Sequence, residues 1–243
     1  NHSAPLGDLE KIQAAAKLLK NSKKPVIIAG GGIKNAQGQN HTIPLAELLN
    51  CPIVTSPGHG DAIPFAHPLN AGQMGPRGNP VASKLVKEAD VILALGTRLG
   101  FNSTFYSYEN INAHASIIHI EIEPTAIGRF FPVSIGIWGD ASAISGQLLQ
   151  ALNKLNHLSK VDQWTAQFKD NRKHFLQHRD ENAIMTTPIQ PSGLFKVLRK
   201  VLPENSSITM DAGTLCLQAT DALNYFEPRS LFTPLDFGLV GFS

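Results

Sequence analysis

The sequence VILALGTR, residues Val91–Arg98, decides the fold of this chain together with SIIHIEIEP, residues Ser116–Pro124. Each stretch is a short, almost wholly apolar run that ends in polar residues. An apolar run bounded by turn residues is typical of a strand buried on both faces, as strands are in parallel sheets. Ligands of open α/β sheets lie just outside the carboxyl ends of the strands. The two runs therefore predict a ligand-facing edge that carries a cation, Arg98, and a carboxylate, Glu121.

Other parts of the chain alternate between strand and helix patterns around these two runs. Further strands are expected at Pro25–Gly30, Pro52–Thr55 and Ile135–Ile137, and helices at Leu9–Leu19, Ile43–Leu49, Val81–Ala89 and Ala141–Leu152. A long Gly/Pro-rich loop is expected from Ser56 to Pro80. Alternation at this spacing predicts an α/β fold with a doubly wound parallel sheet of five strands, resembling a Rossmann domain.

Composition excludes several classes of protein. Hydrophobic residues make up 42% of the 243 residues and charged residues 16%, so a sizeable core is expected. The formal net charge of +2 gives no reason to expect a nucleic acid or a membrane as partner. No apolar run approaches the roughly 20 residues of a transmembrane helix. Two distant cysteines, Cys51 and Cys216, predict no disulfide, a reducing compartment and therefore a cytoplasmic location.

The amino-acid composition of the chain changes after Leu155. Lys160–Asn182 is polar, with three aromatic residues spaced for one face of a helix, and is expected to be a linker helix. A second unit follows, with helix Ser192–Val201, strand Ser207–Met210 and helix Leu215–Leu223. One strand and two helices are too few for an independent core. We therefore expect a domain over residues 1–155, a linker over 156–190 and an incomplete domain over 191–243; because the chain opens without methionine, we expect a piece of a longer protein.

The candidate site residues each allow a functional and a structural interpretation. Gly30-Gly31-Gly32 follows a strand, which fits either close approach to a phosphate or a tight turn that binds nothing. The dinucleotide fingerprint needs a further glycine where Asn35 stands, so a nicotinamide site is disfavoured. Arg98 could bind a phosphate or form a salt bridge. Glu121 could accept hydrogen bonds from a ribose or simply lie at a solvated strand end. Asp140 could be only the residue that starts a helix.

Residues in the loop and tail favour structural roles. His59 and His67 have no nucleophile beside them in sequence and are expected to be structural. Asp61 lies near them without the ligand spacing of a metal site. Cys216 falls in an apolar helix and is expected to be a core thiol.

The order of motifs resembles the central domain of thiamine diphosphate-dependent enzymes. The resemblance runs through KPVIIAGGG, CPIVTSPGHGDAIPFAHPLNAGQMG, ADVILALGTRL, IIHIEIEPTAIGR and GDA, and covers nearly all of Leu9–Leu152. It is greatest for the group formed by acetolactate synthase, glyoxylate carboligase and sulfoacetaldehyde acetyltransferase. The tail, SITMDAGTLCLQATDAL and PLDFGLVGFS, resembles the start of the carboxyl-terminal, diphosphate-binding domain of the same enzymes.

This resemblance implies specific roles. The family's central domain binds FAD, binds ADP or holds no nucleotide. The resemblance implies that any bound nucleotide would contact residues at the strand ends: Gly30, Gly31, Gly32, Thr55, Gly96, Thr97, Arg98, Glu121, Ile122, Gly139 and Asp140. In the tail, Gly238 matches the glycine that holds the aminopyrimidine of thiamine diphosphate, and Val240 the bulky residue beneath the bent cofactor. The chain differs from acetolactate synthases at Leu99–Asn102 and at Gly75–Gly78, which argues against FAD.

The resemblance also implies an activity for the parent protein. The parent would use thiamine diphosphate and Mg2+ to decarboxylate a small 2-oxo acid and join the acyl group to an acceptor, as a homodimer or homotetramer. The Gly-Asp-Gly metal motif and the cofactor-activating glutamate are not found in this sequence, so we expect no catalytic residue, no metal ligand and no turnover from the chain alone. Two alternatives stay open: a nucleotide-binding or purely structural module, and a sulfoacetaldehyde acetyltransferase or glyoxylate carboligase as parent.

Overall fold

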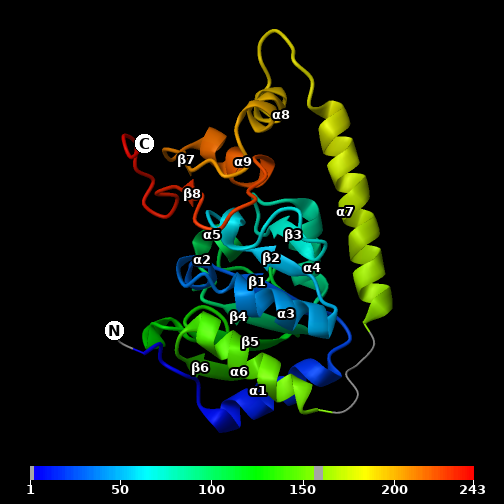
Figure 1. The fold of residues 1–243 in the computed structure, drawn as a ribbon, viewed down its shortest axis with the longest axis vertical. Helices are drawn as coiled ribbons and strands as arrows, with labels where there is room; N and C mark the ends of the chain where they lie inside the picture. The colour runs from blue at the N-terminus through cyan, green and yellow to red at the C-terminus, as the bar shows by residue number, and fades with distance from the viewer. Residues whose placement is uncertain (1–2, 156–160) are drawn as a thin grey trace.

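A six-stranded parallel sheet forms the centre of the molecule in the computed structural model, which describes residues 3–155 and 161–243 (Figure 1). The strands are β1 (Pro25–Ala29), β2 (Ile53–Thr55), β3 (Asn70–Gln73), β4 (Val91–Leu95), β5 (Ser116–Glu121) and β6 (Ile135–Trp138). Their order is β3-β2-β1-β4-β5-β6, and every neighbouring pair is parallel. The predicted doubly wound α/β fold is thereby confirmed.

Helices cover both faces of the sheet. On one face α1 (Leu9–Asn21), α3 (Gln39–Leu49) and α6 (Ala141–Asn153) share an apolar cluster with the sheet. On the other face α4 (Pro80–Glu88) and α7 (Asp162–Asn182) do the same. Short elements follow the carboxyl ends of four strands: α2 (Gly31–Asn35), α5 (Phe101–Thr104), and 3-10 turns at Gly60–Ala62 and Pro124–Ala126. These short elements build the edge where a ligand is expected.

The strand β3 is the main departure from the sequence-based expectation. It lies inside the Gly/Pro-rich segment and consists of Asn-Ala-Gly-Gln, which has neither an apolar run nor an alternating pattern. It pairs with β2 at the edge of the sheet, and the register shifts between Ile53 and Val54. The Asn70 amide donates to the carbonyl of Ile63 at 3.0 Å. Side-chain hydrogen bonds and an edge position, rather than β propensity, therefore make this segment a strand.

A smaller unit follows the linker helix. It contains α8 (Pro191–Val201), β7 (Ile208–Thr209), α9 (Thr214–Ala222) and β8 (Leu231–Phe232). The strands β7 and β8 pair in parallel, where the sequence predicted one strand. Its apolar cluster has only five buried members, Phe195, Ala219, Leu223, Tyr225 and Leu231. So small a core explains why this unit depends on contacts with the first one.

The linker helix α7 is attached to the central sheet by its first half. Trp164 and Phe168 are buried in the cluster under α4, and the Trp164 indole donates to the Pro25 carbonyl at 3.1 Å. Figure 1 shows the helix running along the sheet toward α8. The first residues predicted for the linker, 156–160, lie outside the described part of the chain, as do Asn1 and His2. No helix in the described ranges combines the length and the apolar character that crossing a membrane requires.

Replacing Phe168 by alanine tests how firmly α7 is attached. Phe168 is 1% exposed, so Phe168→Ala leaves a cavity and should lower the free energy of unfolding by about 3–5 kcal/mol. Urea denaturation followed by circular dichroism measures the loss. Phe175→Ala, at a partly buried position on the same helix, is the matched control and should cost clearly less. Equal losses from both variants would contradict this account of the attachment.

Candidate functional site

The predicted site residues gather at the carboxyl edge of the sheet. Because all six strands are parallel, the segments after β1, β4, β5 and β6 emerge on the same side. Gly30–Gly32, Gly96–Arg98, Glu121–Ile122 and Gly139–Asp140 all lie in these segments. The carboxyl-terminal segment of the chain crosses this edge, beside α2 and α5 (Figure 1). The edge is therefore made by two parts of the chain that are far apart in sequence.

The glycine-rich turn is packed against the loop after β4. A Cβ atom on Gly32 would lie 2.7 Å from the Cα of Gly96, and one on Gly96 would lie 2.5 Å from the Cα of Gly32. Gly96 also has a φ of +58°, which favours glycine. The amide of Gly30 donates to Leu95 at 3.0 Å, and that of Gly32 to Gly96 at 2.9 Å. Contact between two backbones thus accounts for these glycines, and it engages two amides that a phosphate would need.

Arg98 faces the carboxyl-terminal segment. Its guanidinium lies 2.7 Å from a carboxylate oxygen of Asp236, and the Asn102 amide donates to the other oxygen at 3.0 Å. The pair is solvent-exposed, with 66% of the Arg98 side chain accessible, so its contribution to stability is about 0–1 kcal/mol. Of the two interpretations that the sequence left open, the structure has Arg98 in a salt bridge.

The remaining edge residues bond within their own loops or to the neighbouring strand. A Glu121 carboxylate oxygen accepts from the amide of Ile122 at 2.9 Å, and Ile122 itself is half exposed. Asp140 caps α6 by accepting from the amide of Ala143 at 2.8 Å, as predicted. The Thr97 carbonyl lies 2.8 Å from Nε2 of buried His119, and Gly139 donates to the Glu121 carbonyl at 3.1 Å. Thr55, at the end of β2, is fully buried.

The tail residues Gly238 and Val240 are held from both sides. Before them, Asp236 pairs with Arg98; after them, the Asp211 carboxylate accepts from the amides of residues 241, 242 and 243 at 2.8, 2.7 and 2.8 Å. These hydrogen bonds lower the pKa of Asp211 to about 2. Val240 is 83% exposed, and an added Cβ at Gly238 would meet no atom within 4 Å. The segment is thus fixed in position while its residues stay open to contact.

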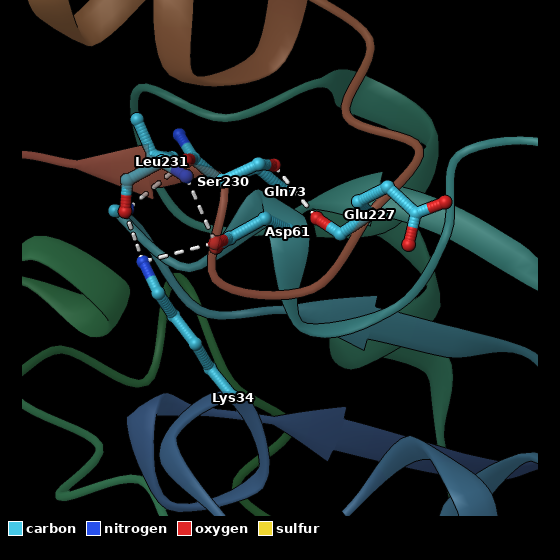
Figure 2. Close-up of polar contacts among 7 residues, drawn as sticks. Lys34, Asp61, Gln73, Glu227, Ser230 and Leu231 are labelled. Carbon is cyan, nitrogen blue, oxygen red and sulfur yellow. Dashed lines mark hydrogen bonds and ion pairs between the residues drawn. The ribbon is translucent and has the colours of Figure 1, made fainter. Parts of the chain in front are cut away.

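A buried ion pair of the central domain contacts β8 of the second unit (Figure 2). The Lys34 ammonium lies 3.1 Å from Oδ2 of Asp61, and both side chains are almost wholly buried. Oδ2 also accepts from the amide of Leu231 at 3.0 Å, while the ammonium donates to the carbonyl of Leu231. One ion pair of the central domain therefore binds both backbone groups of one residue in β8. Sequence reasoning missed this junction because nothing local distinguishes Lys34 from an ordinary helical lysine.

His59 lies beside this junction, packed against Gly31. A Cβ atom on Gly31 would lie 3.0 Å from the imidazole, whose Nδ1 is buried without a hydrogen-bond partner. Burial, and then the positive charge of Lys34, lower the pKa of His59 to about 4. Burial also lowers the pKa of His119. The expectation that His59 is structural agrees with this position, and His67 contacts Glu47 at 3.3 Å.

Comparison with known proteins identifies the family to which the chain belongs. Residues 12–152 match the family model described as thiamine pyrophosphate enzyme, central domain. The chain belongs to this family. The resemblance stated from the motifs, in which the same cofactor is called thiamine diphosphate, is thereby confirmed.

Named relatives extend the similarity through the tail. The chain is 31% identical to a sulfoacetaldehyde acetyltransferase of Alcaligenes xylosoxydans xylosoxydans, over 98% of this chain and 43% of the relative. It is 30% identical to the same kind of enzyme from Castellaniella defragrans, with the same coverage. It is also 31% identical to the acetolactate synthase large subunit of Buchnera aphidicola subsp. Schlechtendalia chinensis, over 97% of this chain and 41% of the relative. The chain thus spans less than half the length of these relatives.

Metal ligands do not converge anywhere in the described ranges. Residues 3–155 and 161–243 contain no group of three or more His, Cys, Asp or Glu side chains placed to hold a metal ion. The acidic groups on either side of the tail residues are already engaged, Asp211 by backbone amides and Asp236 by Arg98 and Asn102. Cys51 and Cys216 are buried free thiols, and burial raises the pKa of Cys51.

Removing one partner of the Lys34–Asp61 pair tests its role in joining the units. Asp61→Asn leaves a buried ammonium without its counter-charge and should lower the free energy of unfolding by about 3–5 kcal/mol. The double variant Lys34→Met/Asp61→Leu should recover much of that loss, because no unpaired charge remains. Lys84→Met, which breaks an exposed pair with Glu88 at 3.8 Å, is the control and should change stability by about 0.5 kcal/mol or less. Urea titration of wild type and the three variants measures these losses. A double variant no more stable than Asp61→Asn would refute the coupling.

The pH dependence of stability tests the state of His59. Its pKa falls from 6.5 to about 4 on folding, so the unfolded chain binds a proton in this range that the folded chain does not. Stability should therefore fall as pH drops from 6.5 to 4, by up to about 3 kcal/mol, and this contribution should level off below pH 4. His59→Gln should remove that part of the slope, leaving the part due to His119. An unchanged slope in unfolding measurements of the variant would contradict the assignment.

Proposed function

We propose that the complete protein is a thiamine diphosphate-dependent enzyme that decarboxylates a small 2-oxo acid and transfers the acyl group to an acceptor. One observation carries this proposal: similarity to such enzymes continues beyond the central domain through 98% of the chain, and so includes the tail. In this proposal the described chain contributes the central domain, the linker helix and the start of the diphosphate-binding domain, with boundaries near residues 155 and 190.

The tail residues fit a role in holding the cofactor. Gly238 has a φ of +62° and open space on its Cα, so that a flat ring system can approach its backbone. Val240 presents an exposed apolar side chain two residues later. Thiamine diphosphate, when bound, supplies the stabilised carbanion that this class of reaction needs. The role of this chain's residues is to bind and orient the ring; Mg2+ ligands are assigned to none of the described residues.

The choice of reaction follows the named relatives. Some relatives are named for sulfoacetaldehyde, an aldehyde, and others for acetolactate synthesis. Decarboxylation of a 2-oxo acid followed by acetolactate-type carboligation is the favoured activity, and a sulfoacetaldehyde acetyltransferase or a glyoxylate carboligase is the alternative. The proposed partners are a small 2-oxo acid and further copies of the protein in a homodimer or homotetramer. A cytoplasmic location belongs to the same proposal.

For the sheet edge we favour a scaffold role over FAD or ADP binding. Arg98 is paired with Asp236, and the Gly30 and Gly32 amides are bonded to the neighbouring loop, which supports an edge used to hold the chain's own tail. Calorimetric titration of the 243-residue chain with FAD and with ADP should therefore give no saturable heat. Saturable binding of either nucleotide, or a yellow preparation, would favour the nucleotide alternative and assign it to the edge residues.

Turnover assays test the proposed function itself. The complete protein should release carbon dioxide from pyruvate only when thiamine diphosphate and Mg2+ are both present, and the 243-residue chain alone should release none. Val240→Ala in the complete protein should lower kcat about 10–100-fold, because a misplaced ring reacts slowly. Val197→Ala, at an exposed position on α8, is the matched control and should leave kcat unchanged. Cofactor-independent turnover, or equal effects of the two variants, would overturn the proposal.

A further inference from the structure

A small crevice lies where the linker helix meets both units, away from the tail residues. Its walls come from α7, from the segment between β2 and β3, and from α9 with the loop after it. The cavity measures about 30 Å3, and its charged lining consists of Arg172, Arg179 and Asp221. None of these residues belongs to the edge or to the junction at Lys34.

Two guanidinium groups share one aromatic ring in this crevice. The Cζ atoms of Arg172 and Arg179 lie 5.1 and 5.9 Å from the ring centroid of Phe65. Arg172 donates one hydrogen bond, to the Phe65 carbonyl at 2.8 Å. Burial, followed by the charge of Arg179, lowers the pKa of Arg172. Two like charges held this close are unfavourable unless an anion lies between them.

The described parts of the chain supply one anion near the pair, the Asp221 carboxylate, which acts on both guanidinium groups without a salt bridge to either and leaves one positive charge uncompensated. Within residues 3–155 and 161–243, no carboxylate oxygen lies within 4.0 Å of Arg172. Arg179 donates to the carboxylate of Asp180, an exposed neighbour, and to the amide oxygen of Asn224, both at 3.4 Å. Asp221 carries the carboxylate of the crevice, but its Oδ1 accepts from the Gln73 amide at 3.1 Å and from Asn79 at 3.0 Å. The crevice therefore holds two cations and one carboxylate that do not touch.

The lining also contains unsatisfied polar groups. Thr55 and Gln73 both line the crevice, and the Thr55 hydroxyl and the Gln73 amide nitrogen are buried without a hydrogen-bond partner. Buried polar atoms without a partner usually mark a bound water or ligand. A cavity of about 30 Å3 accommodates roughly two water-sized groups, since one water needs about 10–15 Å3. The cavity thus has room for the two oxygens of a carboxylate group.

We propose that this crevice binds the carboxylate group of a small organic acid between Arg172 and Arg179. The two carboxylate oxygens fill the cavity and accept charge-assisted hydrogen bonds from the unused guanidinium donors. The remainder of the acid points to the open side of the crevice. Because α7, the central domain and the second unit all contribute to the walls, the bound acid would link the linker helix to both units. The site is independent of the proposed cofactor contacts at Gly238 and Val240.

Titration of the 243-residue chain with sodium acetate tests this site. The Nε–H resonances of Arg172 and Arg179 should shift and saturate, with a Kd on the order of 1 mM, as for a ligand with a few charge-assisted contacts. Arg179→Gln should weaken acetate binding at least 10-fold. Arg129→Gln removes an arginine stacked at 5.3 Å on Phe130, in the segment between β5 and β6 and outside the lining of the crevice, and should leave the affinity unchanged.

Matched salts separate specific binding from ionic strength. Sodium chloride and sodium phosphate at the same ionic strength should produce no saturable shift of the two resonances. If acetate gives no saturable shift, the crevice holds water only and the proposal is wrong. If chloride or phosphate gives the same shift as acetate, the crevice binds anions without preference for a carboxylate, and the proposal is likewise wrong. If Arg179→Gln does not fold, Arg179→Lys replaces it in the test. This variant should bind acetate more weakly than wild type because the planar, bidentate donor is lost.

Discussion

The buried pair of Lys34 and Asp61 is the interaction on which the arrangement of the two units depends. Burying two charges is costly, and the cost is recovered only where the ions are well aligned and further hydrogen bonds satisfy them. Here Oδ2 of Asp61 binds the amide of Leu231 and the Lys34 ammonium binds its carbonyl, so both backbone groups of a buried residue are satisfied, while Oδ1 of Asp61 stays buried without a hydrogen-bond partner. The second unit, whose own core has five members, is thus positioned by the first.

This junction determines how the carboxyl edge of the sheet is used. In a parallel sheet this edge collects loop ends, amides and polar side chains, and is the usual place for a ligand. Here the chain after β8 lies across that edge, and Asp236 occupies Arg98 and Asn102. A doubly wound domain can therefore keep the geometry of a nucleotide-binding fold while its edge serves to hold a neighbouring domain.

The sequence was sufficient for the architecture but not for the long-range pairs. Apolar runs such as Val91–Leu95 reveal strands buried on both faces, and Asp140 before an apolar helical pattern reveals a cap, because both features are local. The strand β3 was missed because an Asn-Ala-Gly-Gln segment is fixed by side-chain hydrogen bonds and by its neighbour β2, not by its own pattern. The partners of Lys34 and Arg98 lie far away in sequence. The periodicity of apolar residues predicts which positions are buried, but it does not predict which residues contact one another.

The glycines show where a motif alone cannot decide between two functions. Gly32 and Gly96 are required whether their backbones approach a phosphate or each other, so the sequence is the same in both cases. In the tail the situation is reversed: Gly238 and Val240 have few contacts of their own, yet Asp236 on one side and Asp211 on the other restrict the segment that carries them. Restricting that segment before a ligand arrives removes part of the entropy that binding would otherwise cost. Glycines explained by internal packing favour a scaffold, whereas open residues on a pre-ordered segment favour a contact surface, and this contrast is the reason that the proposed cofactor contacts are those of the tail.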